Sequence, residues 1–388
     1  MANTKDMTVG SPAKLIAAFA LPLMLGNVFQ QLYTMVDTMV VGQGVGVTAL
    51  ASLGATDWLN WMVLSIIMGF TQGFSLLCAQ NFGASDMQGL RQSVAHSLML
   101  CVAIALIFSV LGQLLIRPML DILDTPDNVL DGAITYLTIV FAFIPAITAY
   151  NFCASILRSL GDSKTPLYAM ITAAIVNVIL DLLFVMGFHW GIAGAAIATA
   201  IAHIAGGSLM LVGVLRNPLV SFKGRKLKLD KPVMGQCVRV GFPVALERMG
   251  ACLGQVVFTS LVTSLGTVAL AAHSLAITAE QAFYIPGYGM QSAAATLAGN
   301  ALGEGDQKKL NHMARTMIVI TVLLMTLTGG LLFAFPEFMM RIFSSDPAVI
   351  EMGASALRIV AVSEPLVGLL IILEGVFNGV GDTRVPFV

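Results

Sequence analysis

Long apolar segments separated by short polar stretches run through almost the whole chain. A helix that crosses the hydrocarbon core of a bilayer needs roughly 20 mostly apolar residues. The pattern predicts ten membrane-spanning helices, the first of which is too long to be a secretory signal peptide. The predicted spans are 14–41, 50–79, 92–115, 130–157, 166–188, 191–214, 234–264, 267–300, 311–335 and 348–378.

The second half of the chain repeats the first at a separation of 220 residues. Short motifs at predicted helix ends occur twice with this separation, which indicates an internal duplication. The pairs are Gly83 with Gly303, Asp86 with Asp306, Gly161 with Gly381, Asp162 with Asp382 and Pro166 with Pro386.

The duplicated unit holds six spans when complete, and an even number of spans returns the chain to the same side of the membrane. The two units then have the same orientation, as in one class of secondary transporters. We therefore expect an all-α polytopic membrane protein with two six-helix lobes related by a pseudo-two-fold axis along the membrane normal. The predicted divisions are an N-terminal lobe over 1–215, a basic cytoplasmic linker over 216–232, and a C-terminal lobe over 233–388 that lacks its last two helices.

Composition and charge support a membrane location. Hydrophobic residues make up 57% of the chain and charged residues 11%, whereas soluble domains carry about 25% charged residues. With a cytoplasmic N-terminus, fifteen of the 20 Lys and Arg residues fall in inside loops and only Arg117 and Arg341 fall in outside loops. The positive-inside rule therefore predicts a multi-pass protein of a bacterial inner membrane with its N-terminus in the cytoplasm.

Two features are better explained by structure than by a special function. The basic stretch from Lys223 to Lys228 is compatible with a nucleic-acid or lipid-headgroup patch, but a cytoplasmic linker accounts for it more simply. We expect contact with membrane lipid, no nucleic-acid partner and a monomer. The five cysteines lie in apolar segments without a CxxC motif, which indicates small buried hydrophobic residues.

Prolines interrupt several of the predicted helices. A membrane helix tolerates proline where neighbouring groups or water satisfy the freed carbonyl. Pro22 and Pro243 occupy corresponding positions in the first helix of each lobe. We interpret them as hinges, with a static packing kink as the alternative.

Carboxylates inside apolar helices are the strongest candidates for function. A charge at the centre of a bilayer costs about 2.5–3.5 kcal/mol on insertion scales, so such residues are functional candidates by default. Asp37 and Asp181 are of this kind; Asn177 shares a helix face with Asp181, and Thr199 lies at mid-depth in the next helix. Their oxygens suit a hard cation such as Na⁺, or the two carboxylates share a proton. The structural alternative is a satisfied polar network.

Other polar side chains in the predicted helices are candidates for lining a substrate cavity. An acid that faces a central cavity attracts organic cations, and a neighbouring aromatic ring contacts them by cation–π interaction. The sequence alone does not orient these side chains. They are Gln30, Asp57, Glu247, Glu280, Gln281 and Tyr284.

Several of these motifs together resemble a known family. They are Leu21-Pro22 with Phe242-Pro243, Gln80-x-x-Gly83-Ala84 with Asn300-x-x-Gly303, the two Gly-Asp…Pro turns, and Ala269-x-Ala271-Ala272-His273. Over essentially its whole length the chain resembles the multidrug and toxic compound extrusion (MATE) transporters, and specifically their bacterial DinF-like branch.

The resemblance implies a function and a site. It implies twelve helices in two lobes, no cofactor, and export of cationic or amphipathic small molecules driven by entry of Na⁺ or H⁺. The family's N-lobe cation site resembles Asp37, Asn177, Asp181 and Thr199. One branch has an acid in the tenth helix, and the motifs do not decide whether Glu364 or Glu374 corresponds to it, so a C-lobe ion site stays open.

Two other functions remain as alternatives. A lipid-linked saccharide flippase of the same broad superfamily would share the fold but needs a basic central cavity for pyrophosphate, whereas the in-membrane charges are mostly acidic. Gly379-Val380-Gly381-Asp382 spells the GxGD motif of intramembrane aspartyl proteases. The motif stands in a turn ahead of a proline, and its repeat mate lacks the first glycine, so a transporter is favoured over an enzyme.

Overall fold

The computed structural model describes residues 11–123, 125–220 and 230–387, and these residues form helices and turns without a strand. The first bundle contains α1 (Pro12–Gly44), α2 (Val47–Gly83), α3 (Met87–Ile122), α4 (Asp127–Ala142), α5 (Ile144–Ser159), α6 (Lys164–Asp181), the π-helix η1 (Leu182–Gly187) and α7 (Gly191–Arg216). The 3₁₀ turn η2 (Pro218–Val220) follows α7. The second bundle contains α8 (Lys231–Thr263), α9 (Thr267–Gly303), α10 (Gln307–Ala334), α11 (Pro336–Phe343), α12 (Pro347–Gly379) and α13 (Arg384–Phe387).

The predicted all-α membrane architecture is confirmed. Seven of the described helices are long and apolar enough to cross a membrane singly, and the bent pair α4–α5 makes an eighth span. The remaining two predicted spans correspond to α8 and α9, which are as long as the others but are not among the helices apolar enough to count as spans. The basic stretch from Lys223 to Lys228 lies outside the described residues, and the proposed domain boundaries stay a prediction.

The repeated motifs form matching helix starts. Asp86 accepts hydrogen bonds from the backbone N–H groups of Gln88 and Gly89 at the start of α3. Its repeat mate Asp306 accepts one from the N–H of Lys309 at the start of α10. Both aspartates therefore satisfy N–H groups that the first helical turn leaves unpaired.

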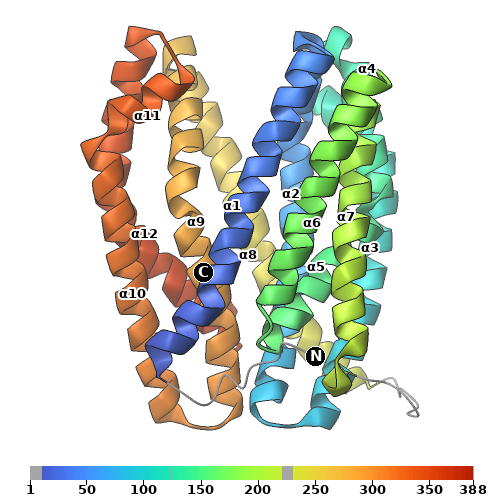
Figure 1. The fold of residues 1–388 in the computed structure, drawn as a ribbon, viewed down its shortest axis with the longest axis vertical. Coiled ribbons are helices and arrows are strands. Elements are labelled where there is room, and N and C mark those ends of the chain that lie inside the picture. Colours follow the sequence, from blue (N-terminus) through green and yellow to red (C-terminus); the bar gives the residue numbers. More distant parts are fainter. Residues whose placement is uncertain (1–10, 124, 221–229, 388) are drawn as a thin grey trace.

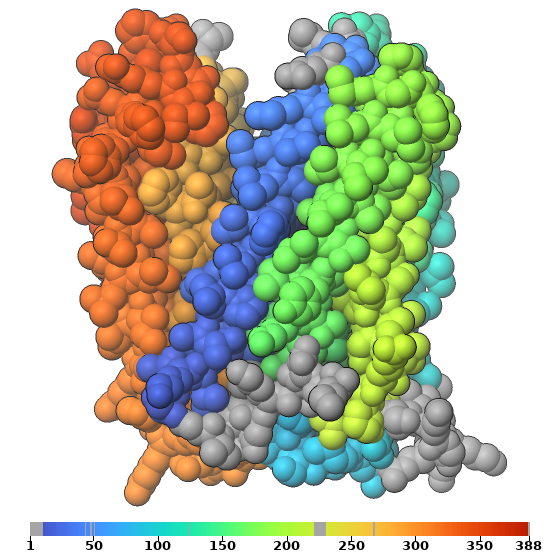
Figure 2. All heavy atoms as spheres, in the orientation of Figure 1, coloured from blue at the N-terminus to red at the C-terminus, as the bar shows by residue number. Residues whose placement is uncertain are grey.

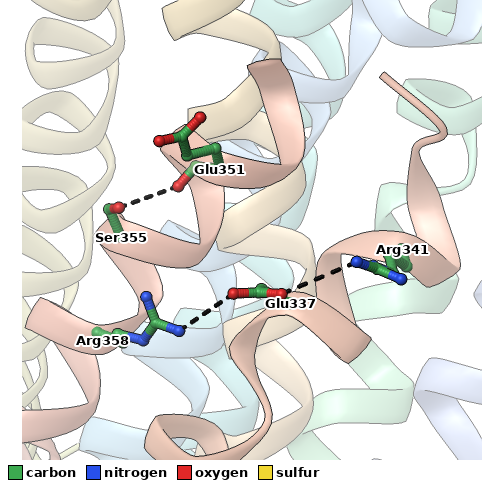
Figure 3. Close-up of polar contacts among 5 residues, drawn as sticks. All are labelled: Glu337, Arg341, Glu351, Ser355 and Arg358. Atoms are coloured by element: carbon green, nitrogen blue, oxygen red, sulfur yellow. Dashed lines mark hydrogen bonds and ion pairs between the residues drawn. The ribbon is translucent and has the colours of Figure 1, made fainter. Parts of the chain in front are cut away.

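Two local features differ from the simple pattern of spans. The predicted fourth span is broken at Phe143 into α4 and α5, which meet at 50°. Pro145 in the first turn of α5 lacks the N–H that a continuous helix would need. The short helix α11 was not predicted; Glu337 on it forms ion pairs with Arg341 at 3.9 Å and with Arg358 of α12 at 3.3 Å (Figure 3).

The two bundles meet at one end and diverge at the other (Figure 1). The end at which they meet carries the turns α2–α3, α5–α6, α9–α10 and α12–α13, and we call it the basic end because Arg91, Lys164 and Lys308 lie there. At the opposite end a cleft separates α11 and α12 from α1 (Figure 2). Helix α2 of the first bundle packs against α8 and α9, and α1 packs against α9.

Glycines allow the closest approach between the bundles. A Cβ atom on Gly83 of α2 would lie 2.0 Å from the carbonyl oxygen of Asn300 in α9. A Cβ atom on Gly303 would in turn lie 2.0 Å from the carbonyl oxygen of Gln80. The duplicated motifs Gln80-x-x-Gly83 and Asn300-x-x-Gly303 therefore contact each other reciprocally and close the basic end.

Candidate cation-binding site and inter-bundle network

The four residues of the predicted cation site lie together in the first bundle. Helix α1 carries Asp37, α6 carries Asn177 and Asp181, and α7 carries Thr199; α6 packs against both neighbours. The carboxyl groups of Asp37 and Asp181 lie close enough to influence each other electrostatically. The Asn177 amide Nδ2 donates a hydrogen bond of 3.3 Å to the Thr199 hydroxyl oxygen.

Several oxygens of this group are buried without a hydrogen-bond partner. Asn177 is 1% exposed and Asp181 is 0% exposed. Asn177 Oδ1, both carboxyl oxygens of Asp181 and Oδ1 of Asp37 have no partner. Because unsatisfied buried polar atoms are costly and rare, such a convergence of acceptors calls for a proton or a cation.

The donor set is that of a hard cation. Among the described residues, no three His, Cys, Asp or Glu side chains are grouped to hold a metal ion. The four side chains themselves offer two carboxyl groups together with the neutral oxygens of an amide and a hydroxyl. Oxygen ligands of this kind suit hard cations, whereas soft and transition metals select thiolate and imidazole.

A small cavity adjoins the four residues. Gln30 and Tyr33 of α1, Tyr150 of α5 and His203 of α7 line it together with Asn177 and Thr199. The Tyr150 and His203 rings are in edge-to-face contact at 5.2 Å. His203 Nδ1 lies 2.9 Å from the carbonyl oxygen of Thr199, so Nδ1 carries the proton.

The helix backbone changes at the site. Helix α6 ends at Asp181, and the next six residues, Leu182–Gly187, form the π-helix η1. Short π-helical segments are rare and are frequent at functional sites. The change in winding at Asp181 is thus a second indication, independent of the side chains, that this part of α6 is specialised.

The predicted substrate-cavity residues lie in three places. Gln30 lines the cavity beside Asn177, and Asp57 of α2 is exposed and close enough to Asp37 to influence it electrostatically. In the second bundle Glu280 and Tyr284 interact one turn apart on α9, while Gln281 is exposed.

The sixth candidate, Glu247, belongs to a polar network between the bundles. The Asn378 amide donates to Glu247 at 3.4 Å. The neighbouring Arg248 donates to the amide oxygens of Gln72 in α2 and Gln291 in α9, each at 3.4 Å. Gln291 Nε2 in turn donates to Glu374 of α12, which lies close enough to Glu247 for the two carboxyl groups to influence each other electrostatically.

The two predicted hinge prolines lie within continuous helices. Pro22 is inside α1 and Pro243 is inside α8. The Met24 side chain, one half-turn beyond Pro22, packs against Gly289 of α9, where an added Cβ would lie 2.5 Å from Met24 Cγ. The hinge role stays a prediction.

Some neighbours of the site were not predicted from the sequence. Tyr33 precedes Asp37 by four residues and His203 follows Thr199 by four, so helical spacing could have found both. Tyr136 and Tyr150 come from α4 and α5, and no local pattern points to them. Gln72, Gln291 and Glu374 meet only because α2, α9 and α12 pack together.

The architecture defines a class of protein. Two membrane bundles of the same orientation, a cleft between them and buried charges within the span are features of secondary transporters. The MatE family matches residues 22–183 and 243–388, so the chain belongs to this family. The family consists of multidrug transporters and not of enzymes.

Individual relatives support the same assignment. The chain is 28% identical to "Probable multidrug resistance protein YpnP" of Bacillus subtilis over 377 residues, which are 97% of this chain and 84% of the relative. It is 26% identical to "Probable multidrug resistance protein NorM" of Thermotoga maritima over 391 residues, covering 97% and 82%. A solved "Outward-facing conformation of a multidrug resistance MATE family transporter of the MOP superfamily" has the same fold, with a TM-score of 0.93 at 22% identity and coverage of 99% and 86%.

Proposed function

We propose that this protein is a multidrug efflux antiporter that exchanges Na⁺ or H⁺ for cationic or amphipathic small molecules. The buried, unpartnered oxygens of Asp37, Asn177 and Asp181 are the observation that carries this proposal. Family membership and the names of the bacterial relatives support it. We further propose an inner-membrane location with the N-terminus and the basic end in the cytoplasm, because of the charge bias of the loops.

The coupling step follows from the arrangement of α1 and α6. Two neighbouring carboxyl groups in a buried site both stay ionised only when a cation lies between them. Without a cation they share a proton and carry one negative charge. Binding of either ligand would draw Asp37 of α1 toward Asp181 of α6. We propose that this movement bends α1 near Pro22 and narrows the cavity beside Asn177, which expels substrate.

The driving force is sufficient for one ion per substrate. A single charge that crosses a potential of about 100 mV yields about 2.3 kcal/mol. Since about 1.4 kcal/mol corresponds to a factor of ten, this sustains a substrate gradient of about fiftyfold.

The test compares Asp37→Asn and Asp181→Asn with the control Asp121→Asn. Asp121 is exposed near the C-terminal end of α3, away from the basic end. Everted vesicles that carry the full-length protein are given a Na⁺ gradient or a pH gradient separately, and drug transport is followed. We expect the two site variants to lose ion-driven transport and the control to keep it. Wild-type transport in both site variants would remove the proposal.

The alternatives receive less support. The chain belongs to the MatE family and the matching relatives are named as multidrug resistance proteins, so a saccharide flippase is not favoured. Asp382 of the GxGD sequence is exposed in the turn after α12, and the family is one of transporters, which excludes the protease reading.

A further inference from the structure

A second polar pocket lies between the two bundles, apart from the cation site. Residues of α2 and α5 line it on one side and residues of α8, α9 and α12 on the other. It lies in the half of the molecule toward the basic end, below the cleft. Its polar lining consists of Gln72, Ser75, Ser155, Arg158, Arg248, Gln291, Ser292, Thr296 and Asn378.

Two guanidinium groups in this pocket have no carboxylate partner. Within the described ranges, neither Arg158 nor Arg248 forms an ion pair. Arg158 donates to the Ser155 hydroxyl at 3.2 Å, and Arg248 donates only to two amide oxygens. The Arg248 Nε–H group is buried without any partner. Both arginines are half-buried. Because charges withdrawn from water are normally paired, these two guanidinium groups remain able to bind an anion.

The nearby acids do not fill that capacity. Glu374 influences Arg248 electrostatically, but its carboxyl group accepts the hydrogen bond from Gln291. Glu247 accepts a hydrogen bond from the Asn378 amide at 3.4 Å. Within the described ranges, neither glutamate lines the pocket or forms an ion pair with its two guanidinium groups.

We propose that this pocket binds the carboxylate group of a zwitterionic amphipathic substrate, an assignment that rests on the proposed efflux function. Arginine pairs with carboxylates through two parallel N–H···O bonds, and the hydroxyl groups of Ser155 and Thr296 add further donors. Guanidinium groups from both bundles, Arg158 on α5 and Arg248 on α8, contact the same pocket. A bound carboxylate would therefore link the bundles at the floor of the cleft.

The same face of α9 provides for the positive end of such a molecule. Glu280, Tyr284 and Tyr288 follow at intervals of four residues and share a helix face with Gln291. The Tyr284 and Tyr288 rings are in edge-to-face contact at 6.3 Å, and Tyr288 is 43% exposed. At about 1.5 Å per residue, Glu280 lies about 16 Å from Gln291 along the helix. A zwitterion fits this succession of groups better than a simple anion.

The test is equilibrium binding of a matched pair of probes to the purified full-length protein in an uncharged detergent. Rhodamine B carries a free carboxylate and is a zwitterion, whereas its ethyl ester is the corresponding cation. Fluorescence anisotropy reports both affinities without an ion gradient. We expect Arg158→Gln and Arg248→Gln each to weaken rhodamine B binding by about tenfold to a hundredfold and to leave the ester unchanged. Arg216→Gln, at the exposed end of α7, serves as the control and should change neither.

Two further measurements keep the outcome decisive. Arg248→Lys conserves the charge but loses bidentate geometry, so it should retain part of the preference for rhodamine B over the ester. Equal weakening of both probes in the Gln variants, or no weakening of rhodamine B, would overturn the proposal. The second measurement repeats rhodamine B binding in nanodiscs that contain phosphatidylglycerol. If this lipid competes with rhodamine B in the wild type but not in Arg248→Gln, the pocket binds a lipid phosphate instead. If the lipid does not compete, the result supports a substrate carboxylate.

Failure of this proposal is distinguishable from failure of the proposed function. If rhodamine binding ignores the arginines while ion-driven transport still needs Asp37 and Asp181, only the carboxylate pocket is wrong. If transport is independent of those aspartates while the probe preference follows Arg158 and Arg248, only the coupling site is wrong.

Discussion

The reciprocal glycine contact at the basic end gives the sharpest mechanical prediction. In Gly83→Ala the new methyl group would lie 2.0 Å from the Asn300 carbonyl oxygen and 2.7 Å from the Asn300 carbonyl carbon and Cα. All three atoms belong to the backbone, so no side-chain rotation relieves the overlap. The helices α2 and α9 must separate by about 1.4 Å at this point to reach the 3.4 Å of an ordinary van der Waals contact.

The substitution raises the free energy of the conformation in which the basic end is closed. Overpacking of this kind costs about 1–3 kcal/mol, which changes the ratio of closed to open molecules by about five- to 150-fold. Because the overlap exists only when the bundles touch, an opposite conformation with the basic end open is spared. We therefore expect Gly83→Ala to shift the protein toward that conformation and to lower its thermal stability.

The assay is the distance between spin labels on Gln88→Cys and Gln307→Cys, which are exposed at the starts of α3 and α10. The five native cysteines are buried, so labelling is expected at the introduced thiols. In Gly83→Ala the distance distribution should gain a longer component. The control is Gly330→Ala. Gly330 is an exposed residue of α10, and a Cβ atom added there would have no neighbour within 4 Å. Identical distributions and melting temperatures for Gly83→Ala and wild type would refute the reasoning.

Two further variants test the local energetics. Asp162 accepts hydrogen bonds from the N–H groups of Lys164 and Thr165 and from the Thr165 hydroxyl, so Asp162→Ala should destabilise the protein by about 1–2 kcal/mol in thermal unfolding. Its exposed repeat mate should tolerate Asp382→Ala, and equal effects would contradict this account. Glu364 is 0% exposed and both of its carboxyl oxygens lack partners, so Glu364→Met should raise the unfolding free energy by about 1–3 kcal/mol. A lower stability would mean that this carboxyl group makes an interaction that Met cannot replace.

Much of the fold was predictable because membrane helices are specified by long apolar segments. The ten spans, the duplication and the helix starts at Asp86 and Asp306 all follow from patterns that are local or strictly periodic in the sequence. The break at Phe143 and the short helix α11 were not predicted, because neither changes the average hydropathy over a span. The π-helix after Asp181 was not predicted either.

The part of the candidate site that could be predicted consists of residue types that are unusual inside an apolar helix. Asp37 and Asp181 could be selected because a carboxylate is costly inside an apolar helix. The tyrosines around them and the pocket of Arg158 and Arg248 could not, since amphipathic side chains of these types occur at many helix positions. Their roles depend on which helices become neighbours, and that information lies in contacts between residues far apart in the chain.

The crossings of Gly83 with Asn300 and of Gly303 with Gln80 are made by main-chain atoms. Neither peptide carbonyls nor glycine Cα groups gain or lose a proton at physiological pH. This contact is consequently indifferent to the chemical form of the driving ion, and acidification or sodium loading cannot release it by changing its charge. An ion that separates these two backbones must act from elsewhere, by changing the shape of a bundle until they no longer fit against each other.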